Sequence, residues 1–248
     1  MRRLIARLCV LLVCARTQDV GDDGDLLDAL LESMTFAISE RFQESHDFLR
    51  TRAWYGNSHI GNRPKQARAY FDVARRLRPR TICEIGFNGG HSAAIFLAAA
   101  GSRASMISFD LQQFTYSSMA TRLVQAIFPG QLHVVEGLSQ DTVPRFAAKR
   151  GRVCDLFSVD GDHSYEGTAR DIANAAAATR GNGMLILDDV IPASPPRRAF
   201  DEAVAAGTLV APACTENVAI DVSYVHRRDQ TKVRHLNMSW CTARVPDR

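Results

Sequence analysis

Between residues 64 and 190, short apolar runs alternate with longer amphipathic or alanine-rich stretches. The short runs predict five buried strands, at Thr81–Ile85, Ser105–Phe109, Leu132–Val135, Asp155–Val159 and Met184–Leu187. The longer stretches predict helices over about Pro64–Leu77, His91–Ala100, Ser117–Ile127 and Tyr165–Thr179, the last of them stopped by Gly181 and Gly183. Strands that alternate with helices of this length give a parallel, doubly wound α/β sheet with right-handed crossovers.

The hydrophobic period changes after Gly207. Val218–Val225 and His235–Val245 predict two strands around a polar turn at Arg227–Lys232. The fold class expected is therefore a Rossmann-like sheet that is mostly parallel and carries an antiparallel C-terminal strand. We expect one such domain over residues 64–248, with no internal repeat.

Apolar residues recur at three- and four-residue spacing over Asp25–Glu44, which predicts a helix. The following segment, 52–63, is aromatic and rich in turn-forming residues, and is typical of a loop. Residues 19–63 are thus expected to form a helical N-terminal cap with a loop. The apolar stripe packs either on the core or on a second copy of the chain, so a homo-oligomer is one of two alternatives.

The first residues differ in character from the rest of the chain. Residues 1–18 hold several arginines and no acidic residue, and Leu8–Ala15 is a short apolar run. This composition predicts a cleaved targeting segment, with the secretory pathway favoured over an organelle and a cytoplasmic location as the alternative. A membrane span needs about 20 apolar residues, so no integral span is expected here.

The composition is that of an ordinary globular protein, with 46% hydrophobic and 23% charged residues. The net charge is only +3, and its basic cluster lies at residues 226–228 and 232–235. A solvated hairpin turn explains that cluster more simply than a nucleic-acid surface does, so nucleic acid is not expected as a partner.

Four cysteines remain outside the targeting segment. Cys83 and Cys154 lie within apolar strand patterns and are predicted to be buried free thiols. Cys214 and Cys241 flank the C-terminal strands and are free to pair if the compartment is oxidising. No Cys or His spacing indicates zinc. The glycosylation triplet Asn237-Met238-Ser239 is a further, weak indication of secretion.

The turn after the first predicted strand is rich in glycine, reading Glu84-Ile85-Gly86-Phe87-Asn88-Gly89-Gly90-His91. Glycines let the backbone turn sharply and approach a ligand closely, and the next helix points its amide groups at that ligand. Asp110 ends the second strand 20 residues after Gly90. A carboxylate there can accept both ribose hydroxyls of a nucleoside. The glycine pattern departs from G-x-G-x-x-G, which makes a nicotinamide-dependent oxidoreductase a minor alternative.

At these residues the chain resembles the class I S-adenosylmethionine-dependent methyltransferases. Glu84-x-Gly86-x-x-x-Gly90 is similar to their E/D-x-G-x-x-x-G motif, and Asp110 to their ribose-binding acid. The resemblance implies that S-adenosylmethionine lies over the glycine turn. It further implies cofactor contacts from residues that flank this turn or end the third and fourth strands, namely Asn88, His91, Ser139 and Asp160.

Acidic residues follow the fourth and fifth predicted strands, as Asp160-Gly161-Asp162-His163 and Asp188-Asp189. Neighbouring parallel strands bring their carboxyl ends to one crevice, so these carboxylates are expected to converge. Crowded carboxylates repel one another, and a hard divalent cation such as Mg²⁺ would neutralise them.

This second pattern resembles the metal-dependent small-molecule O-methyltransferases, including the sugar O-methyltransferases of antibiotic pathways and the cephalosporin-hydroxylase-like branch. The resemblance covers roughly residues 64–200. It implies Mg²⁺ ligands at Asp160, Asp188 and Asp189 and a catalytic base at Asp162 or His163. The expected reaction is Mg²⁺-dependent O-methylation of a small molecule or a sugar hydroxyl with a neighbouring oxygen.

Simpler interpretations of the same residues stay open. Asp162 and Ser164 precede a predicted helix and are suited to capping its N-terminus. Asp188-Asp189 is also compatible with a polar strand end, and His163 with a solvent-facing side chain. The alternatives for function are a metal-independent methyltransferase and a non-catalytic protein that binds S-adenosylmethionine.

Overall fold

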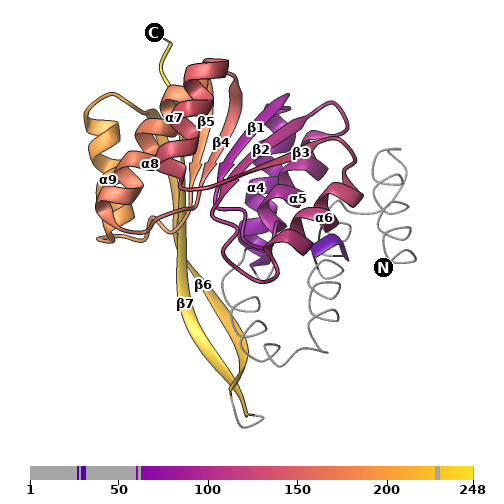
Figure 1. Ribbon diagram of the computed structural model, residues 1–248. Helices are drawn as coiled ribbons and strands as arrows, with labels where there is room; N and C mark the ends of the chain where they lie inside the picture. The colour runs from indigo at the N-terminus through magenta and orange to yellow at the C-terminus, as the bar shows by residue number, and fades with distance from the viewer. Residues whose placement is uncertain (1–26, 28, 32–59, 61–62, 227–229, 248) are drawn as a thin grey trace.

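The computed structural model describes residues 27, 29–31, 60, 63–226 and 230–247. These residues build a seven-stranded sheet in the order β3-β2-β1-β4-β5-β7-β6 (Figure 1). The strands are β1 Thr81–Ile85, β2 Ser105–Asp110, β3 Leu132–Glu136, β4 Cys154–Val159, β5 Thr179–Leu187, β6 Val210–His226 and β7 Gln230–Arg244. β1 to β5 pair in parallel, whereas β7 pairs antiparallel with β5 and β6. The predicted fold class, with its antiparallel C-terminal strand, is confirmed.

Three helices cover each face of the sheet in the described part of the chain (Figure 1). They are α4 Pro64–Leu77, α5 His91–Ala100 and α6 Ser117–Ile127 on one face, and α7 Ser139–Arg150, α8 Tyr165–Ala178 and α9 Pro195–Ala205 on the other. Because strand side chains alternate between faces, the core divides into two layers. Ile82 and Leu156 pack on the α4–α6 side, whereas Ile85 and Phe157 pack on the α7–α9 side.

The hydrophobic pattern did not indicate α7 and α9. In α7 only Thr142 and Val143 are buried, and Pro144 lies inside the helix, so the apolar stripe is weak. Two prolines open α9, where the fixed backbone angle of proline suits a first turn. In addition, α8 ends one residue earlier than expected, and the two glycines expected to stop it lie within β5.

Only part of the N-terminal prediction falls on described residues. Leu27, Leu30 and Leu31 are helical and buried, in agreement with the helix expected over Asp25–Glu44. They join the core layer formed by α4, α5 and α6. The remainder of that helix, the targeting segment 1–18 and most of the 52–63 loop lie outside the described residues. No helix among the described residues is long and apolar enough to cross a membrane.

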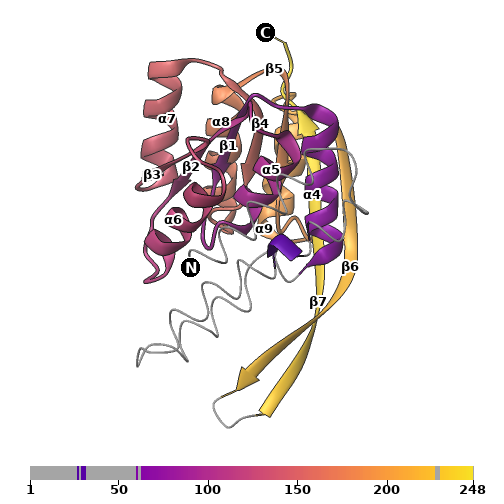
Figure 2. The same cartoon turned by 90° about the vertical axis from the view of Figure 1, so that its right-hand side faces the viewer.

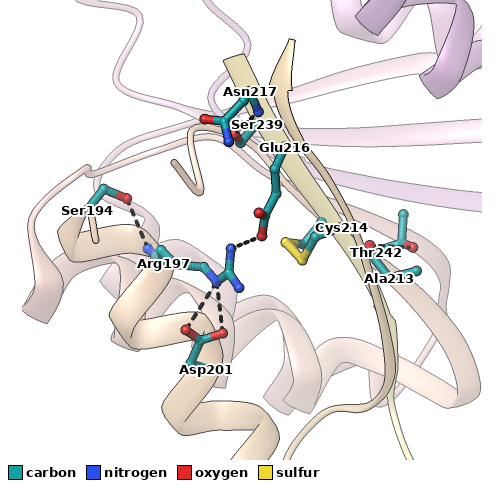
Figure 3. Close-up of a disulfide and its surroundings, with 10 residues drawn as sticks. Ser194, Arg197, Asp201, Ala213, Cys214, Glu216, Asn217, Ser239 and Thr242 are labelled. Carbon is teal, nitrogen blue, oxygen red and sulfur yellow. Dashed lines mark hydrogen bonds and ion pairs between the residues drawn. A yellow bond between two sulfur atoms is a disulfide. The ribbon is translucent and has the colours of Figure 1, made fainter. Parts of the chain in front are cut away.

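All four cysteines of the described chain are paired. Cys83 and Cys154 form a disulfide, which corrects the prediction of free thiols. The prediction of burial was right, but the cysteines are 71 residues apart, and their closeness depends on β1 pairing with β4. Cys214 and Cys241 lie directly opposite each other on β6 and β7 and form the second disulfide (Figure 3).

The hairpin of β6 and β7 extends beyond the rest of the sheet (Figure 2). β5 pairs with β7 only over Cys241–Arg244, so the residues of β7 before Cys241 pair with β6 alone. Arg197 of α9 bonds to Glu216 of β6 and to Asp201, which ties this helix to the base of the hairpin (Figure 3).

Candidate active site

A cavity of about 570 Å³ opens at the carboxyl ends of the parallel strands. Its walls come from the loops after all five parallel strands, represented by Gly86, Asp110, Ser139, Asp160 and Asp189. In open α/β sheets, ligands bind in the crevice at this edge, where the strand order reverses. Here the reversal lies between β1 and β4, the strands that precede Gly86 and Asp160.

The turn after β1 is closely packed against the turn after β4. The amide of Asp160 donates to the carbonyl of Ile85 at 3.0 Å. Gly86 has φ +94°, and a Cβ at this position would lie 1.9 Å from the carbonyl oxygen of Asp160. A side chain at residue 86 would therefore push the two loops apart, and the glycine is required by the geometry.

Asp110 joins the end of β2 to the glycine turn. Its Oδ2 accepts the amides of Phe87 at 2.8 Å and Asn88 at 3.1 Å, and its Oδ1 accepts the amide of Gln112 at 2.6 Å. The carboxylate lines the cavity. Asn88 lies in the left-handed region with φ +48°, and its Oδ1 accepts the hydroxyl of Tyr116 at 2.5 Å.

Glu84 lies behind the glycine turn and is fully buried. Its carboxylate accepts the hydroxyls of Ser92 at 2.5 Å and Ser108 at 2.7 Å. Burial raises the pKa of Glu84 to about 8, against the two serine hydrogen bonds, which lower it. Gly90 and His91 are also buried at the start of α5. Of the expected cofactor residues, five line the cavity, namely Gly86, Asn88, Asp110, Ser139 and Asp160, whereas the buried Glu84, Gly90 and His91 do not line it.

The loop after β3 is held by a residue that sequence reasoning missed. The hydroxyl of Ser139 donates to Oδ1 of Asp171 at 2.7 Å. Asp171 is a buried carboxyl on α8, and its burial raises its pKa. The sequence does carry an indication of this role. Asp171 is a charged residue at a helical spacing that places it on the buried face of α8, with Thr168 and Ala175.

Three side chains from two loops form a compact group beside the glycine turn. Nε2 of His163 lies 3.5 Å from Oδ1 of Asp160 and 3.5 Å from Oδ2 of Asp189. One ligand atom from each of the three residues lies within 4.8 Å of the others. The hydrogen bond to Asp160, with the charges of the surrounding aspartates, raises the pKa of His163 to about 9.

Asp188 is turned away from this group, although it was expected to join Asp160 and Asp189. Its Oδ1 accepts Nε2 of Gln66 at 2.6 Å and the amide of Asp189 at 2.7 Å. Burial raises the pKa of Asp188 well above its ordinary range, and the charges of Asp160 and Asp189 add to the shift. The structure therefore brings together two of the three expected carboxylates, with His163 as the third member.

Asp162 lies at the N-terminus of α8. Its Oδ1 accepts the amide of Ser164 at 2.8 Å, and this bond lowers its pKa. A Cβ on Gly167 would lie 2.1 Å from Oδ2, so the carboxylate packs directly over the first turn of the helix. Ser164 caps α8 by accepting the amide of Gly167 at 3.0 Å, as the capping interpretation predicted.

The N-terminal end of α4 brings two residues to the site that no motif indicated. Arg63 precedes the helix and lines the cavity. Burial raises the pKa values of Asp188 and Asp189, and the positive charge of Arg63 partly offsets this rise. Gln66 is buried and holds Asp188. Among the described residues that line the cavity, Arg63 is the only lysine or arginine.

Residues 83–190, from β1 to just past Asp189, match a family described as a methyltransferase domain. This segment of the chain is similar to a methyltransferase domain. The matched segment contains the glycine turn, Asp110 and the acidic group, but not α4 or the C-terminal hairpin. No curated protein matches the sequence.

Solved structures with the same fold cover nearly the whole chain. The cofactor-bound protein Rv0187 from MTB has 19% identity and a TM-score of 0.63, with 94% of each chain covered. An O-methyltransferase from Bacillus cereus in complex with SAH has 14% identity and a TM-score of 0.61, with 95% of this chain and 97% of that chain covered. TomG from Streptomyces achromogenes, an O-methyltransferase of tomaymycin synthesis in complex with SAM, has 16% identity and a TM-score of 0.58, with 96% of each chain covered. At these identities the likeness establishes the fold.

The buried carboxyl of Glu84 predicts that the stability of the protein depends on pH. With its pKa raised to about 8, folded Glu84 keeps a proton that the unfolded chain releases near its ordinary pKa of 4.5. The free energy of unfolding should therefore fall as pH rises through this interval, by on the order of 5 kcal/mol. Urea unfolding of the wild type and of Glu84→Gln between these pH values measures the effect. The free energy of unfolding of the wild type, relative to that of the variant, should fall as pH rises. A difference that stays constant with pH would contradict the raised pKa of Glu84.

Proposed function

We propose that this protein is a methyltransferase, which transfers a methyl group from S-adenosylmethionine to a hydroxyl oxygen of a small molecule or a sugar, with Mg²⁺ held in the same cavity. The observation that carries the proposal is the single cavity shared by the glycine turn with Asp110 and by the group of Asp160, His163 and Asp189. Two of the structurally similar proteins are O-methyltransferases with SAH or SAM bound, which supports this choice.

The cavity walls after β1, β2 and β3 suit S-adenosylmethionine. Gly86 contributes backbone alone to the cavity wall, which lets a ligand approach closely, and Asp110 offers carboxylate oxygens for ribose hydroxyls. Ser139 and Gln140 line the side of the cavity that follows β3. The hydroxyl of Ser139 donates to Asp171, and Oε1 of Gln140 accepts from Arg170. The adenine ring would therefore meet the Ser139 oxygen as an acceptor and Nε2 of Gln140 as a donor.

The donor set after β4 and β5 suits a hard divalent cation. Asp160 and Asp189 contribute carboxylate oxygens, which are the ligands that Mg²⁺ prefers. Burial, followed by the charge of Asp160, raises the pKa of Asp189, so a bound cation would favour the ionised form of this carboxylate. We assign Asp160 and Asp189 as ligands and Asp188 as the residue that fixes Asp189 from behind. When bound, Mg²⁺ would orient adjacent oxygens of the acceptor and lower the pKa of its hydroxyl.

His163 is the base that we assign to this reaction. The acceptor hydroxyl would give its proton to Nε2 while its oxygen attacks the methyl carbon and the carbon–sulfur bond breaks, leaving S-adenosylhomocysteine. The carboxylates that raise the pKa of His163 are those assigned to the cation, so neutralising them makes the ring a proton acceptor near neutral pH. Asp162 is a weaker base, because its carboxylate is held at a helix N-terminus with a lowered pKa.

Substitution of the two candidate bases tests this function. Methyl transfer from labelled S-adenosylmethionine to a catechol and to a sugar diol would be measured with Mg²⁺ present. In His163→Gln, kcat should fall by roughly 10²–10⁴, the usual contribution of a positioned base. In Asp162→Asn, kcat should change less than about tenfold, and the fold should be kept, because Oδ1 of asparagine can still accept the amide of Ser164.

Binding of Mn²⁺, followed by electron paramagnetic resonance, serves as the control and should be retained in both variants. A large loss of kcat in Asp162→Asn with normal activity in His163→Gln would reassign the base. No methyl transfer by the wild type to either class of acceptor would count against adjacent hydroxyl oxygens as the target.

A further inference from the structure

The disulfides bear on where this protein folds. Cys83 and Cys154 connect β1 and β4 in the core, and Cys214 and Cys241 connect the two strands of the C-terminal hairpin. Every cysteine of the described chain is therefore paired. Disulfides form and persist in oxidising compartments such as the lumen of the endoplasmic reticulum, and are rare in reducing ones.

The same hairpin exposes an asparagine close to its disulfide. Asn237 lies on the part of β7 that pairs only with β6, four residues before Cys241, and it is exposed. The cross-strand neighbour of Asn237 is Ala219, a small and exposed residue. The next residue, Met238, is buried on the opposite face. The side chain of Asn237 thus points away from the core, with room for a bulky substituent.

Asn237 also begins an acceptor triplet for N-linked glycosylation, Asn237-Met238-Ser239. Ser239 has a structural use of its own, because its hydroxyl accepts the amide of Asn217 at 3.0 Å and its carbonyl accepts the amide of Val190 at 3.1 Å. In the folded protein Ser239 is fully buried. An enzyme that reads both Asn237 and Ser239 must therefore act before β7 docks against the body.

We propose that this protein matures in the secretory pathway and carries an N-linked glycan on Asn237. The donor is an oligosaccharide linked to a lipid diphosphate. A bond forms between Nδ2 of Asn237 and C1 of the first sugar, the bond from C1 to the diphosphate oxygen breaks, and the amide proton goes to a base of the transferring enzyme. The lipid diphosphate is the leaving group. The composition of residues 1–18, which lie outside the described residues, agrees with entry into this pathway.

Glycosidase treatment of the full chain tests the proposal. The chain would be produced with its own N-terminus in animal cells, as wild type, Asn237→Gln and the control Asn174→Gln, which changes an asparagine of α8 outside any triplet. A peptide N-glycosidase should lower the apparent mass of the wild type and of the control by one glycan and leave Asn237→Gln unchanged. Non-reduced peptide maps should show both disulfides.

Peptide mass spectrometry keeps the test decisive if Asn237→Gln fails to accumulate. The enzyme converts a glycosylated asparagine to aspartate, so residue 237 of the treated wild type should read as Asp. An unmodified Asn237 in chain recovered from the secretory pathway would overturn the proposal. Recovery of the wild type in the cytosol with free thiols would overturn it as well.

Discussion

Replacing Asp110 with Ala is expected to weaken the binding of S-adenosylhomocysteine by about 100-fold. The carboxylate lines the cavity, and it also accepts the amides of Phe87 and Asn88, so its loss removes a ligand contact and releases the glycine turn. A hydrogen bond to a charged group is worth about 1.5–3 kcal/mol, which corresponds to roughly tenfold to 150-fold in affinity. Isothermal titration calorimetry of the wild type and the variant measures the effect.

The matched control for this substitution is Asp201→Ala. Asp201 is an exposed carboxylate of α9 that bonds to Arg197 and does not line the cavity. The Asp201→Ala protein should bind S-adenosylhomocysteine with the same affinity as the wild type. A folded Asp110→Ala protein with unchanged affinity would show that Asp110 is a structural residue without a role in cofactor binding.

Replacing Asp189 with Asn is expected to lower methyl transfer by roughly 10²–10³ while leaving affinity for S-adenosylhomocysteine unchanged. Asp189 has φ +54°, a left-handed conformation that asparagine also adopts readily, so the variant removes the charge without straining the backbone. Loss of one carboxylate ligand should weaken cation binding and with it the activation of the acceptor hydroxyl. Activity assays and Mn²⁺ binding by electron paramagnetic resonance measure the two effects separately.

A chelator provides the complementary comparison. Chelation should bring the wild type down to the level of Asp189→Asn, and added Mg²⁺ should restore only the wild type. Asp162→Asn removes the same charge from the same cavity and should keep its response to Mg²⁺. Wild-type activity that a chelator does not change, together with full activity in Asp189→Asn, would indicate a metal-independent methyltransferase.

The sequence pattern predicted the central sheet well because each parallel strand is a short apolar run bounded by polar residues. The hydrophobic pattern did not predict α7 and α9, and for α7 the reason is local. α7 buries little of its surface and contains Pro144, so it has no clear hydrophobic period. The pattern also did not predict the disulfide between Cys83 and Cys154. This pairing is non-local, because it depends on which strands become neighbours in the sheet.

The candidate site shows the same division between local and non-local information. Asp110, Asp160 and Asp189 follow strands, and the shared edge of a parallel sheet brings such residues to one cavity. Asp188 and Asp189 are adjacent in sequence, yet the first bonds to Gln66 and the second faces the cavity. That difference depends on the docking of α4, which no motif specifies.

Calorimetric titration of the full chain with S-adenosylhomocysteine, with and without Mg²⁺, is the measurement that tests the central claim most directly. We predict saturable binding at one site with a dissociation constant in the micromolar range. In a separate thermal unfolding experiment, the ligand should raise the midpoint of unfolding. Absence of binding under both conditions, from protein shown to be folded, would contradict a role in S-adenosylmethionine-dependent methyl transfer.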